Sequence, residues 1–294
     1  MPLRNFLNNQ KFLNMAAIQM TSGLNIGENL IQAGDLIKKA VDKGAGLVAL
    51  PENFACMTKD PRDIHSVAEY FGHGRIQEWA SRLAEKLNIW IIAGTLPIKS
   101  NKEKEQDLIT LGKRKIRAAC LVFNDNGLIV GRYDKMHLFD VKISTSGEIY
   151  QESNQIEPGD QVVVIDSPFG KLGLSVCYDL RFPELYRKLR EKNADIFFIP
   201  SAFTYTTGLA HWEILLRARA IENQCVVVAP AQAGTHENGR KTYGHSCIID
   251  AWGNFSDQSL PADQPGFAIS KIDLLASHVL REEFPVFENR KIKS

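Results

Sequence analysis

The sequence predicts an α/β protein in which two sheets pack together and helices cover their outer faces. Short apolar runs, typical of buried strands, alternate with segments whose apolar residues recur at helical spacing. Crossover helices and hairpin signals occur in both halves of the chain, and no low-complexity segment divides it. We therefore expect a single domain over residues 1–294, with residues 1–14 as a disordered lead.

A strand–helix–strand unit follows this lead. Residues 15–20 form an apolar run that predicts a buried strand, and residues 27–43 carry apolar side chains at helical spacing. A second strand is expected in residues 44–53. The pattern then repeats, with an amphipathic helix over residues 75–87 and a strand over residues 89–95. This alternation is typical of a partly parallel sheet.

The middle of the chain carries hairpin signals. The sequence NDNG lies between the apolar residues 117–123 and 128–133, and an Asn-Gly pair in this position favours a tight hairpin turn. The charged residues 99–106 are expected to form an exposed loop. The polar residues 142–159 are expected to form an irregular rim.

A thiol at a strand-to-helix corner is the main feature of the second half. Residues 162–166 and 172–176 are expected to pair as a hairpin whose second strand is closed by Cys177. Asp179 is expected to cap the helix that follows, over residues 180–192. The remaining predicted elements are strand 195–200, helix 210–223, and strands 225–229, 246–250 and 267–272.

The composition argues against several classes of protein. Hydrophobic residues make up 44% of the chain and charged residues 23%, as in an ordinary globular protein, and no apolar run reaches the length of a membrane span. The net charge of +1, with no basic stripe, gives no attraction for nucleic acid or anionic lipid. The five widely spaced cysteines and the absence of a signal-peptide pattern predict reduced thiols in the cytoplasm.

Three reactive side chains each follow a predicted strand: Glu52, Lys135 and Cys177. In α/β sheets, ligands bind in the crevice beyond the carboxyl ends of the strands. Each side chain also has a purely structural interpretation. Glu52 suits a helix start, Lys135 a solvated surface and Cys177 a packed core, where most free cysteines are inert.

Together these groups suit nucleophilic catalysis. A carboxylate can take the proton of a thiol as general base, and an ammonium can stabilise the thiolate and the oxyanion of a tetrahedral intermediate. Amide N–H groups at a helix start favour the same charges. A Cys/His pair using His137 or His245 stays open as an alternative. No metal or cofactor is predicted, since the chain has no HExxH, CxxC, dinucleotide-binding or P-loop motif.

Five motifs occur in one order along the chain. They are LPENF at Glu52, GRYDKMHLFD at Lys135, GLSVCYDLRFPELY at Cys177, the segment 200–224, and YGHSCIIDAWG at residues 243–253. Through them the chain resembles the nitrilase superfamily of carbon-nitrogen hydrolases from about residue 15 to residue 290. The resemblance implies a four-layer αββα sandwich, a Glu52–Lys135–Cys177 triad, and a homodimer. It also implies a second active-site glutamate, best matched by Glu152.

Finer similarities imply a reaction. Tyr178, directly after the nucleophile, resembles amidases rather than true nitrilases. The segments LRARAIENQ, AQAGTH and RKTYGHS resemble the branch that hydrolyses deaminated glutathione to 2-oxoglutarate and cysteinylglycine. The alternative within the superfamily is an ω-amidase acting on 2-oxoglutaramate. Outside enzymatic function, a non-catalytic binding module on the same fold stays open, and a papain-like protease is disfavoured by the lysine.

Substrate recognition is predicted less sharply. The expected partner is a small-molecule amide with an anionic keto-acid end, for which Arg181 is a candidate donor. Arg181 equally suits a structural ion pair with Glu184. The other candidate substrate-binding residues are Tyr178, Phe203 and His137. The polar loop that carries His236, Arg240 and Tyr243 is either a cover for the site or an ordinary surface loop.

Overall fold

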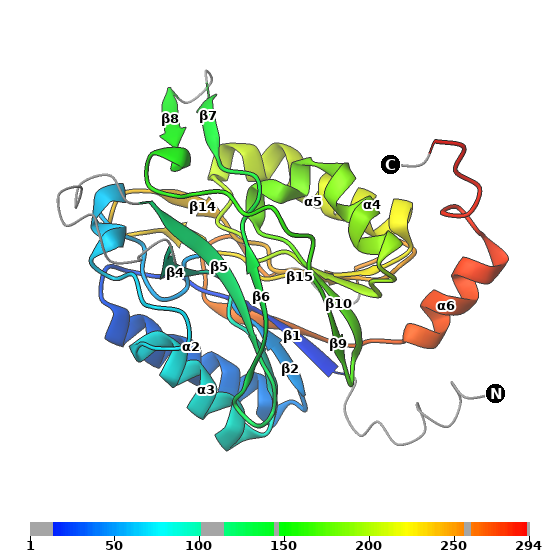
Figure 1. The fold of residues 1–294 in the computed structure, drawn as a ribbon, viewed down its shortest axis with the longest axis horizontal. Coiled ribbons are helices and arrows are strands. Elements are labelled where there is room, and N and C mark those ends of the chain that lie inside the picture. Colours follow the sequence, from blue (N-terminus) through cyan, green and yellow to red (C-terminus); the bar gives the residue numbers. More distant parts are fainter. Residues whose placement is uncertain (1–13, 101–114, 144–146, 256–259, 293–294) are drawn as a thin grey trace.

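The computed structural model describes residues 14–100, 115–143, 147–255 and 260–292. Residues 1–13 of the predicted lead and most of the predicted loop 99–106 lie outside this part. Asn14 is already the first residue of strand β1 (Asn14–Gln19), so the lead is at least one residue shorter than predicted. The layers are visible in Figure 1, with α2 and α3 on one outer face, α4 and α5 on the other, and the two main sheets between them.

In the described residues, the first sheet has seven strands in the order β16-β1-β2-β3-β5-β4, with β6 also paired to β5. Strands β1, β2 and β3 run parallel, and the antiparallel pairs β3·β5 and β5·β6 turn β6 back to the direction of β3. The carboxyl ends of β2 and β6 therefore lie at the same edge. The bounds are β1 (Asn14–Gln19), β2 (Leu47–Ala49), β3 (Trp90–Ile92), β4 (Leu96–Lys99), β5 (Ile116–Phe123), β6 (Ile129–Asp134) and β16 (Gly266–Lys271).

The second sheet, within the same described part, has five strands in the order β15-β12-β11-β10-β9. Strands β10, β11 and β12 run parallel, while β9 and β15 are antiparallel at the edges. The bounds are β9 (Val164–Ser167), β10 (Gly170–Leu174), β11 (Ile196–Phe198), β12 (Val226–Ala229) and β15 (Cys247–Ile249). Two small hairpins, β7 (Asp140–Ile143) with β8 (Glu148–Gln151) and β13 (Ala233–Thr235) with β14 (Lys241–Tyr243), lie apart from both sheets.

Alternating side chains of β1 separate the two cores of the sandwich. Met15 and Ala17 belong to the cluster that joins the two sheets and reaches α5. Ala16 and Ile18 belong to the cluster beneath α2 and α3. Because successive side chains of a strand point to opposite faces, one short apolar run serves both layers.

Helices α2 and α3 match the predicted ones to within a residue, α4 and α5 start at other residues than predicted, and α6 was not predicted. The bounds are α2 (Ile26–Asp42), α3 (Arg75–Leu87), α4 (Pro183–Glu191), α5 (Tyr205–Asn223) and α6 (Leu274–Glu283). Helix α5 starts five residues before the predicted residue 210, with Thr204 as its cap. No helix formed by the described residues has the length and apolar character needed to cross a bilayer.

The prediction that Asp179 caps a helix over residues 180–192 is wrong. Cys177–Arg181 form a 3-10 turn, and α4 begins only at Pro183, with Phe182 as its N-cap. Pro183 suits the first position of a helix because that position needs no N–H donor. The Asp179 carboxylate is instead buried behind the nucleophile, where it accepts a hydrogen bond from the N–H of Val176.

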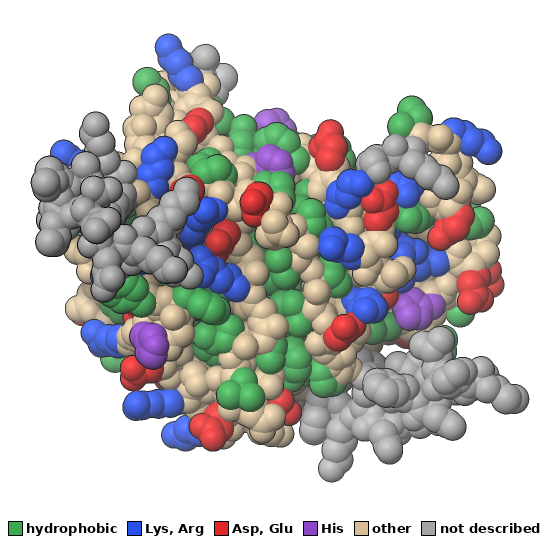
Figure 2. Space-filling model, viewed as in Figure 1, with side chains coloured by type: hydrophobic (Ala, Val, Ile, Leu, Met, Phe, Trp, Pro, Cys, Tyr) green, Lys and Arg blue, Asp and Glu red, His purple; other side chains and the backbone are tan. Residues whose placement is uncertain are grey.

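The predicted rim, residues 142–159, contains ordered structure. It includes strand β8, which pairs with β7, and the short 3-10 turn η2 (Glu152–Asn154). In Figure 1 the β7–β8 hairpin projects from the edge of the molecule. The face drawn in Figure 2 shows basic and acidic side chains interspersed, in agreement with the nearly neutral composition.

Candidate active site

Glu52 lies just beyond β2 and is almost completely buried. Its Oε2 accepts a hydrogen bond of 2.8 Å from the N–H of Ala202, beyond β11 in the other sheet. The loop before it is packed closely against Gly94, where an added Cβ would lie 1.9 Å from the carbonyl oxygen of Pro51. Glycine is required there by space and by a φ of 41°. The carboxylate is therefore fixed between the two sheets.

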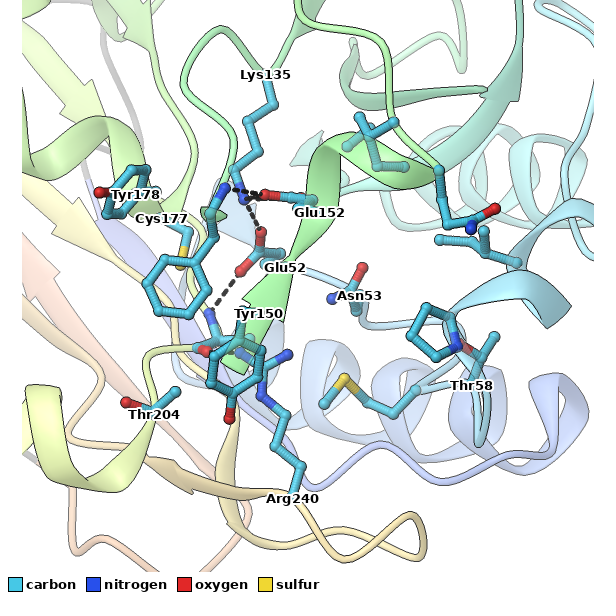
Figure 3. Close-up of a pocket in the computed structure, with 18 of the residues that line it drawn as sticks. Glu52, Asn53, Thr58, Lys135, Tyr150, Glu152, Cys177, Tyr178, Thr204 and Arg240 are labelled. Carbon is cyan, nitrogen blue, oxygen red and sulfur yellow. Dashed lines mark hydrogen bonds and ion pairs between the residues drawn. The ribbon is translucent and has the colours of Figure 1, made fainter. Parts of the chain in front are cut away.

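Lys135 follows β6 directly, and its side chain is 2% exposed. Its Nζ lies 2.8 Å from Oε1 of Glu52 and 2.8 Å from Oε2 of Glu152. Figure 3 shows the ammonium between the two carboxylates. An ammonium buried to this extent is stable only when it is paired and hydrogen-bonded, and both conditions hold here.

Glu152 reaches the site from η2, after the β7–β8 hairpin. Its Oε2 also accepts a hydrogen bond of 2.7 Å from the N–H of Phe139. This second bond fixes the carboxylate on the far side of Lys135. The structure thus brings Glu152 together with Glu52 and Lys135.

Cys177 occupies a strained corner between β10 and the 3-10 turn. Its φ is 50°, in the left-handed region that residues with a Cβ rarely adopt. The corner is held by the Cys177 N–H, which donates a 2.9 Å hydrogen bond to the carbonyl oxygen of Pro200. Such strain is typical of functional sites, and Figure 3 shows Cys177 on the same side of the pocket as Glu52 and Lys135.

The electrostatics favour a neutral thiol beside an ionised carboxylate. Burial raises the pKa of Cys177, the Glu52 charge raises it further, and Lys135 offsets only part of the rise. Burial also opposes ionisation of Glu52, but the Lys135 charge and the hydrogen bond from Cys177 hold the pKa of Glu52 below its ordinary value. The Glu152 and Glu52 charges outweigh burial and hold the pKa of Lys135 well above its usual range. The sulfur therefore needs a base when it attacks.

Asp179 joins the segments that carry the lysine and the cysteine. Its Oδ2 accepts hydrogen bonds from the hydroxyl of Tyr133 (2.7 Å) and the N–H of Val176 (2.8 Å). Its Oδ1 accepts from the N–H and the Nδ1 of His137 (3.0 and 2.7 Å), since a carboxylate facing donors only accepts. Tyr133 and His137 flank Lys135 in sequence. These hydrogen bonds of Asp179 were not predicted, because in the sequence they are marked only by an acidic residue two positions after Cys177.

A cavity of about 410 Å³ opens onto these groups. Its volume lies in the usual range for small-molecule sites. Tyr178, Arg181 and Phe203, three of the candidate substrate-binding residues, line it. Arg181 bonds to Nδ1 of His211 (3.1 Å) and lies over the rings of Tyr178 and Phe203. Among the ion pairs of the described residues, none joins Arg181 to Glu184.

The structure does not bring His137 to the cavity. Its ring stacks on Phe182 with centroids 3.8 Å apart and bonds to Asp179, and it is not among the residues that line the cavity. His245 is absent from that lining too, so no Cys/His pair forms with Cys177 there. His236 is buried between Ser22 and Thr242.

The side chains of the cavity suit acyl transfer better than metal chemistry. No group of three or more His, Cys, Asp or Glu side chains in the described part of the chain is arranged to hold a metal ion. The first N–H groups of a 3-10 turn have no intrahelical acceptor, and Tyr178 contributes one directly after the sulfur. A thiol, a carboxylate and an ammonium therefore line one pocket, next to the start of a 3-10 turn, and such a set can support addition to a carbonyl.

Comparisons with known proteins agree with this chemistry. The family model described as carbon-nitrogen hydrolase matches residues 14–279. A deaminated glutathione amidase of Yersinia enterocolitica is 40% identical over 97% of this chain and 95% of its own. Those of Dictyostelium discoideum and Homo sapiens are 42% and 39% identical, each over 94% of this chain and over 93% and 82% of their own.

Solved structures show the same fold. The C. elegans NitFhit protein superimposes with a TM-score of 0.82 at 38% identity, over 95% of this chain and 65% of its own. Saccharomyces cerevisiae Nit3, a member of the nitrilase superfamily, gives a TM-score of 0.80 at 27% identity, over 95% of this chain and 96% of its own. The predicted αββα sandwich is confirmed. The chain belongs to the carbon-nitrogen hydrolase family of the nitrilase superfamily, and it is a hydrolase of carbon-nitrogen bonds.

Proposed function

We propose that this protein is an amidase that hydrolyses deaminated glutathione to 2-oxoglutarate and cysteinylglycine through a thioester on Cys177. The observation that carries the proposal is that Glu52, Lys135 and Cys177 line one cavity, with Nζ of Lys135 2.8 Å from the Glu52 carboxylate. The names of the relatives, at about 40% identity over nearly the whole chain, support this substrate.

The charge of the cavity supports an anionic substrate. Its lining has four cationic side chains, Lys59, Lys135, Arg181 and Arg240, against the two carboxylates Glu52 and Glu152. The surplus of positive charge favours a substrate that carries carboxylates, as deaminated glutathione does. It offers no advantage to a small neutral amide.

In the first half-reaction, Glu52 takes the proton of the Cys177 thiol while the sulfur attacks the amide carbonyl. Lys135 and the N–H of Tyr178 stabilise the oxyanion. Glu52 then gives the proton to the leaving nitrogen, the carbon–nitrogen bond breaks, and cysteinylglycine leaves as a free amine. A 2-oxoglutaryl thioester remains on the sulfur.

In the second half-reaction, Glu52 takes a proton from water, and the oxygen adds to the thioester carbonyl. The carbon–sulfur bond breaks, the proton returns to the sulfur, and 2-oxoglutarate leaves. In both half-reactions Glu152 stays hydrogen-bonded to Lys135, on the side of the ammonium opposite to Glu52. Glu152 is thus proposed to keep Lys135 charged and oriented.

The direct test compares turnover of deaminated glutathione with turnover of 2-oxoglutaramate. We expect a higher kcat/KM for deaminated glutathione, and a fall of more than about 10³-fold for both substrates in Cys177→Ala. Cys247→Ala, which removes a buried thiol of β15 outside the cavity lining, is the matched control and retains activity. Preference for 2-oxoglutaramate would assign an ω-amidase, and turnover by Cys177→Ala would reject the scheme.

We also propose a homodimer that covers the outer face of α5. Leu209, Ile214 and Ile221 are exposed on this helix, although its opposite side is packed into the core. Exposed apolar side chains in such number on one outer helix are typical of an interface. Sedimentation velocity should give a dimer that Ile214→Glu weakens, whereas a monomer at micromolar concentration would contradict it.

A cytoplasmic location is proposed on the state of the cysteines. All five are free thiols, and four of them are buried. Such thiols persist in a reducing compartment. Fractionation of cells that express the full chain tests the location, and recovery in a secreted or membrane fraction would contradict it.

A further inference from the structure

Arg240 lies in the cavity wall with hydrogen-bonding capacity that the protein does not use. It follows the turn between β13 and β14, and Figure 3 shows its side chain extending past Tyr150 toward Glu52. Its Nε is shielded from solvent and has no hydrogen-bond partner among the described residues. Its Nη2 donates to the carbonyl oxygen of Ala202. A buried donor without a partner is costly, and a ligand that accepts from it removes the cost.

Two other largely buried arginines are paired, and Arg190, whose Nε also has no partner among the described residues, lies 3.9 Å from Glu288. Arg219 donates to the carbonyl oxygen of Leu180 through Nε and Nη2 and lies 3.0 Å from Glu222. Arg281 forms an ion pair of 2.9 Å with Asp195. Among the ion pairs of the described residues, by contrast, none includes Arg240. Its charge therefore remains available to an anion that enters the cavity.

The surroundings fix the direction of the guanidinium. Its central carbon lies 5.4 Å from the centroid of the Tyr150 ring, in the arrangement of a cation–π contact. Nη2 is bound to Ala202 and the ring lies on one side, which leaves the Nε–H without a bond to the described residues. An arginine held in this way presents a preformed edge to a carboxylate.

The distance between the Arg240 guanidinium and the Glu52 carboxylate has an upper limit, because both groups are bonded to Ala202. This residue donates its N–H to Glu52 and accepts from Arg240 through its carbonyl oxygen. The two bonds and the span of one residue place the guanidinium within roughly 9 Å of the Glu52 carboxylate. In a 2-oxoglutaryl group, the carboxylate carbon lies about 5 Å from the reacting carbonyl carbon. Such a group can therefore contact Cys177 and Arg240 at the same time.

We propose that Arg240 is the carboxylate subsite for the acyl half of the substrate, and that it makes the enzyme selective for amides of short dicarboxylic acids. This inference rests on the proposed amidase function and adds to it which end of the substrate is recognised. Arg181, the second arginine of the wall, remains available to the leaving half, whose carboxylate lies farther from the cleaved bond.

The test uses Arg240→Gln, which keeps a donor for Ala202 but removes the charge. We expect kcat/KM to fall about 10- to 100-fold, mainly through KM, for both deaminated glutathione and 2-oxoglutaramate, because the two share the acyl half. Arg240→Lys should recover part of the loss, since it restores charge without the forked donors. The matched control is Arg82→Gln, which changes an exposed arginine of α3 outside the cavity lining. It should leave kcat/KM unchanged for both substrates.

Two substrates that differ only in the carboxylate separate recognition from general damage. Wild type should prefer the monoamide of glutaric acid over pentanamide, and Arg240→Gln should lose that preference while its activity on pentanamide is kept. A loss confined to deaminated glutathione would place Arg240 at the leaving half. An unchanged preference would overturn the subsite altogether.

Binding without turnover distinguishes failure of this inference from failure of the proposed function. Calorimetry on Cys177→Ala should show binding of 2-oxoglutaramate that is weakened at least tenfold when Arg240→Gln is added. This result would support the subsite even if wild type hydrolysed neither keto-acid amide. Absence of binding, or equal binding to both proteins, would overturn it.

Discussion

The Cys177 sulfur is a weak nucleophile in its resting state. Burial and the Glu52 charge raise the pKa of its thiol, although Lys135 acts in the opposite sense. The negative charges of Glu52 and Glu152, which lie beside Lys135, offset much of the stabilisation that its positive charge would give to a thiolate. In the proposed mechanism, formation of the thiolate therefore depends on transfer of the Cys177 proton to Glu52 as the substrate arrives.

The pH dependence of kcat/KM follows from the same groups. Glu52 acts as a base only when ionised, and Lys135 together with the Cys177 hydrogen bond holds its pKa below the ordinary 4.5 despite burial. Activity should thus stay within about twofold between pH 7 and pH 5 and fall only below pH 4.5. Circular dichroism at each pH controls for unfolding. A fall with a midpoint near pH 6 to 7 would mean that burial dominates and raises the pKa of Glu52.

At the scale of the elements, the site depends on the segments that leave the strands. Lys135 follows β6 and Cys177 follows β10, which belong to different sheets. Asp179 ties these segments together through Tyr133 and Val176. Burial and the Asp179 charge raise the pKa of Tyr133 well above its ordinary value, so its hydroxyl remains a donor. We therefore expect Asp179 to position the site rather than to take part in the chemistry.

Replacing Asp179 by Asn should separate position from chemistry. One oxygen becomes an N–H group that faces donors, so we expect a loss of about 3 kcal/mol in the free energy of unfolding. We also expect kcat to fall roughly 100-fold with a smaller change in KM, because the sulfur and the ammonium lose their relative position. Urea denaturation and steady-state kinetics measure the two effects.

Tyr133→Phe is a milder change to the same hydrogen-bond network than Asp179→Asn. It removes one of the hydrogen bonds to Asp179 and should cost about 1 kcal/mol of stability with a correspondingly smaller loss of kcat. If Asp179→Asn were destabilised while its kcat stayed within twofold of wild type, Asp179 would support the fold without positioning the site.

At the scale of the molecule, the sandwich brings together residues that are distant in sequence. Lys135 and Cys177 follow strands of different sheets, and Ala202, which follows β11, orients Glu52. Pairing of β1 with β16 joins the beginning of the described chain to its last strand. This pairing supports the single domain, which stays a prediction.

Local patterns predicted much of this arrangement. Apolar periodicity gave the bounds of α3 to the residue, and the buried runs before Glu52 and Cys177 marked two strand ends. Because ligands bind beyond the carboxyl ends of strands, the reactive residues were expected in one crevice, but the packing of one sheet on the other could not be read from these runs. The motifs then identified the family, and they predicted Glu152, which the structure places beside Lys135.

Other parts of the site depend on contacts that no local pattern records. Asp179 has the spacing of a helix cap, but four donors from two segments of the chain surround it in the fold. His137 stands in a motif-like stretch but stacks on Phe182. Arg240 lies in an ordinary polar loop, and only the hairpin that carries it places it beside Tyr150. Each position is set by tertiary packing.

Trapping the intermediate is the most direct test of whether the Cys177 sulfur attacks the substrate and forms a thioester. Wild-type enzyme mixed with excess deaminated glutathione, quenched in acid and digested, should yield the Cys177 peptide with the mass of a 2-oxoglutaryl group added. Lys135→Met should form this species more slowly, and Cys177→Ala should not form it. Continued turnover with the Cys177 peptide always unmodified, or the acyl group attached to another residue, would contradict the account.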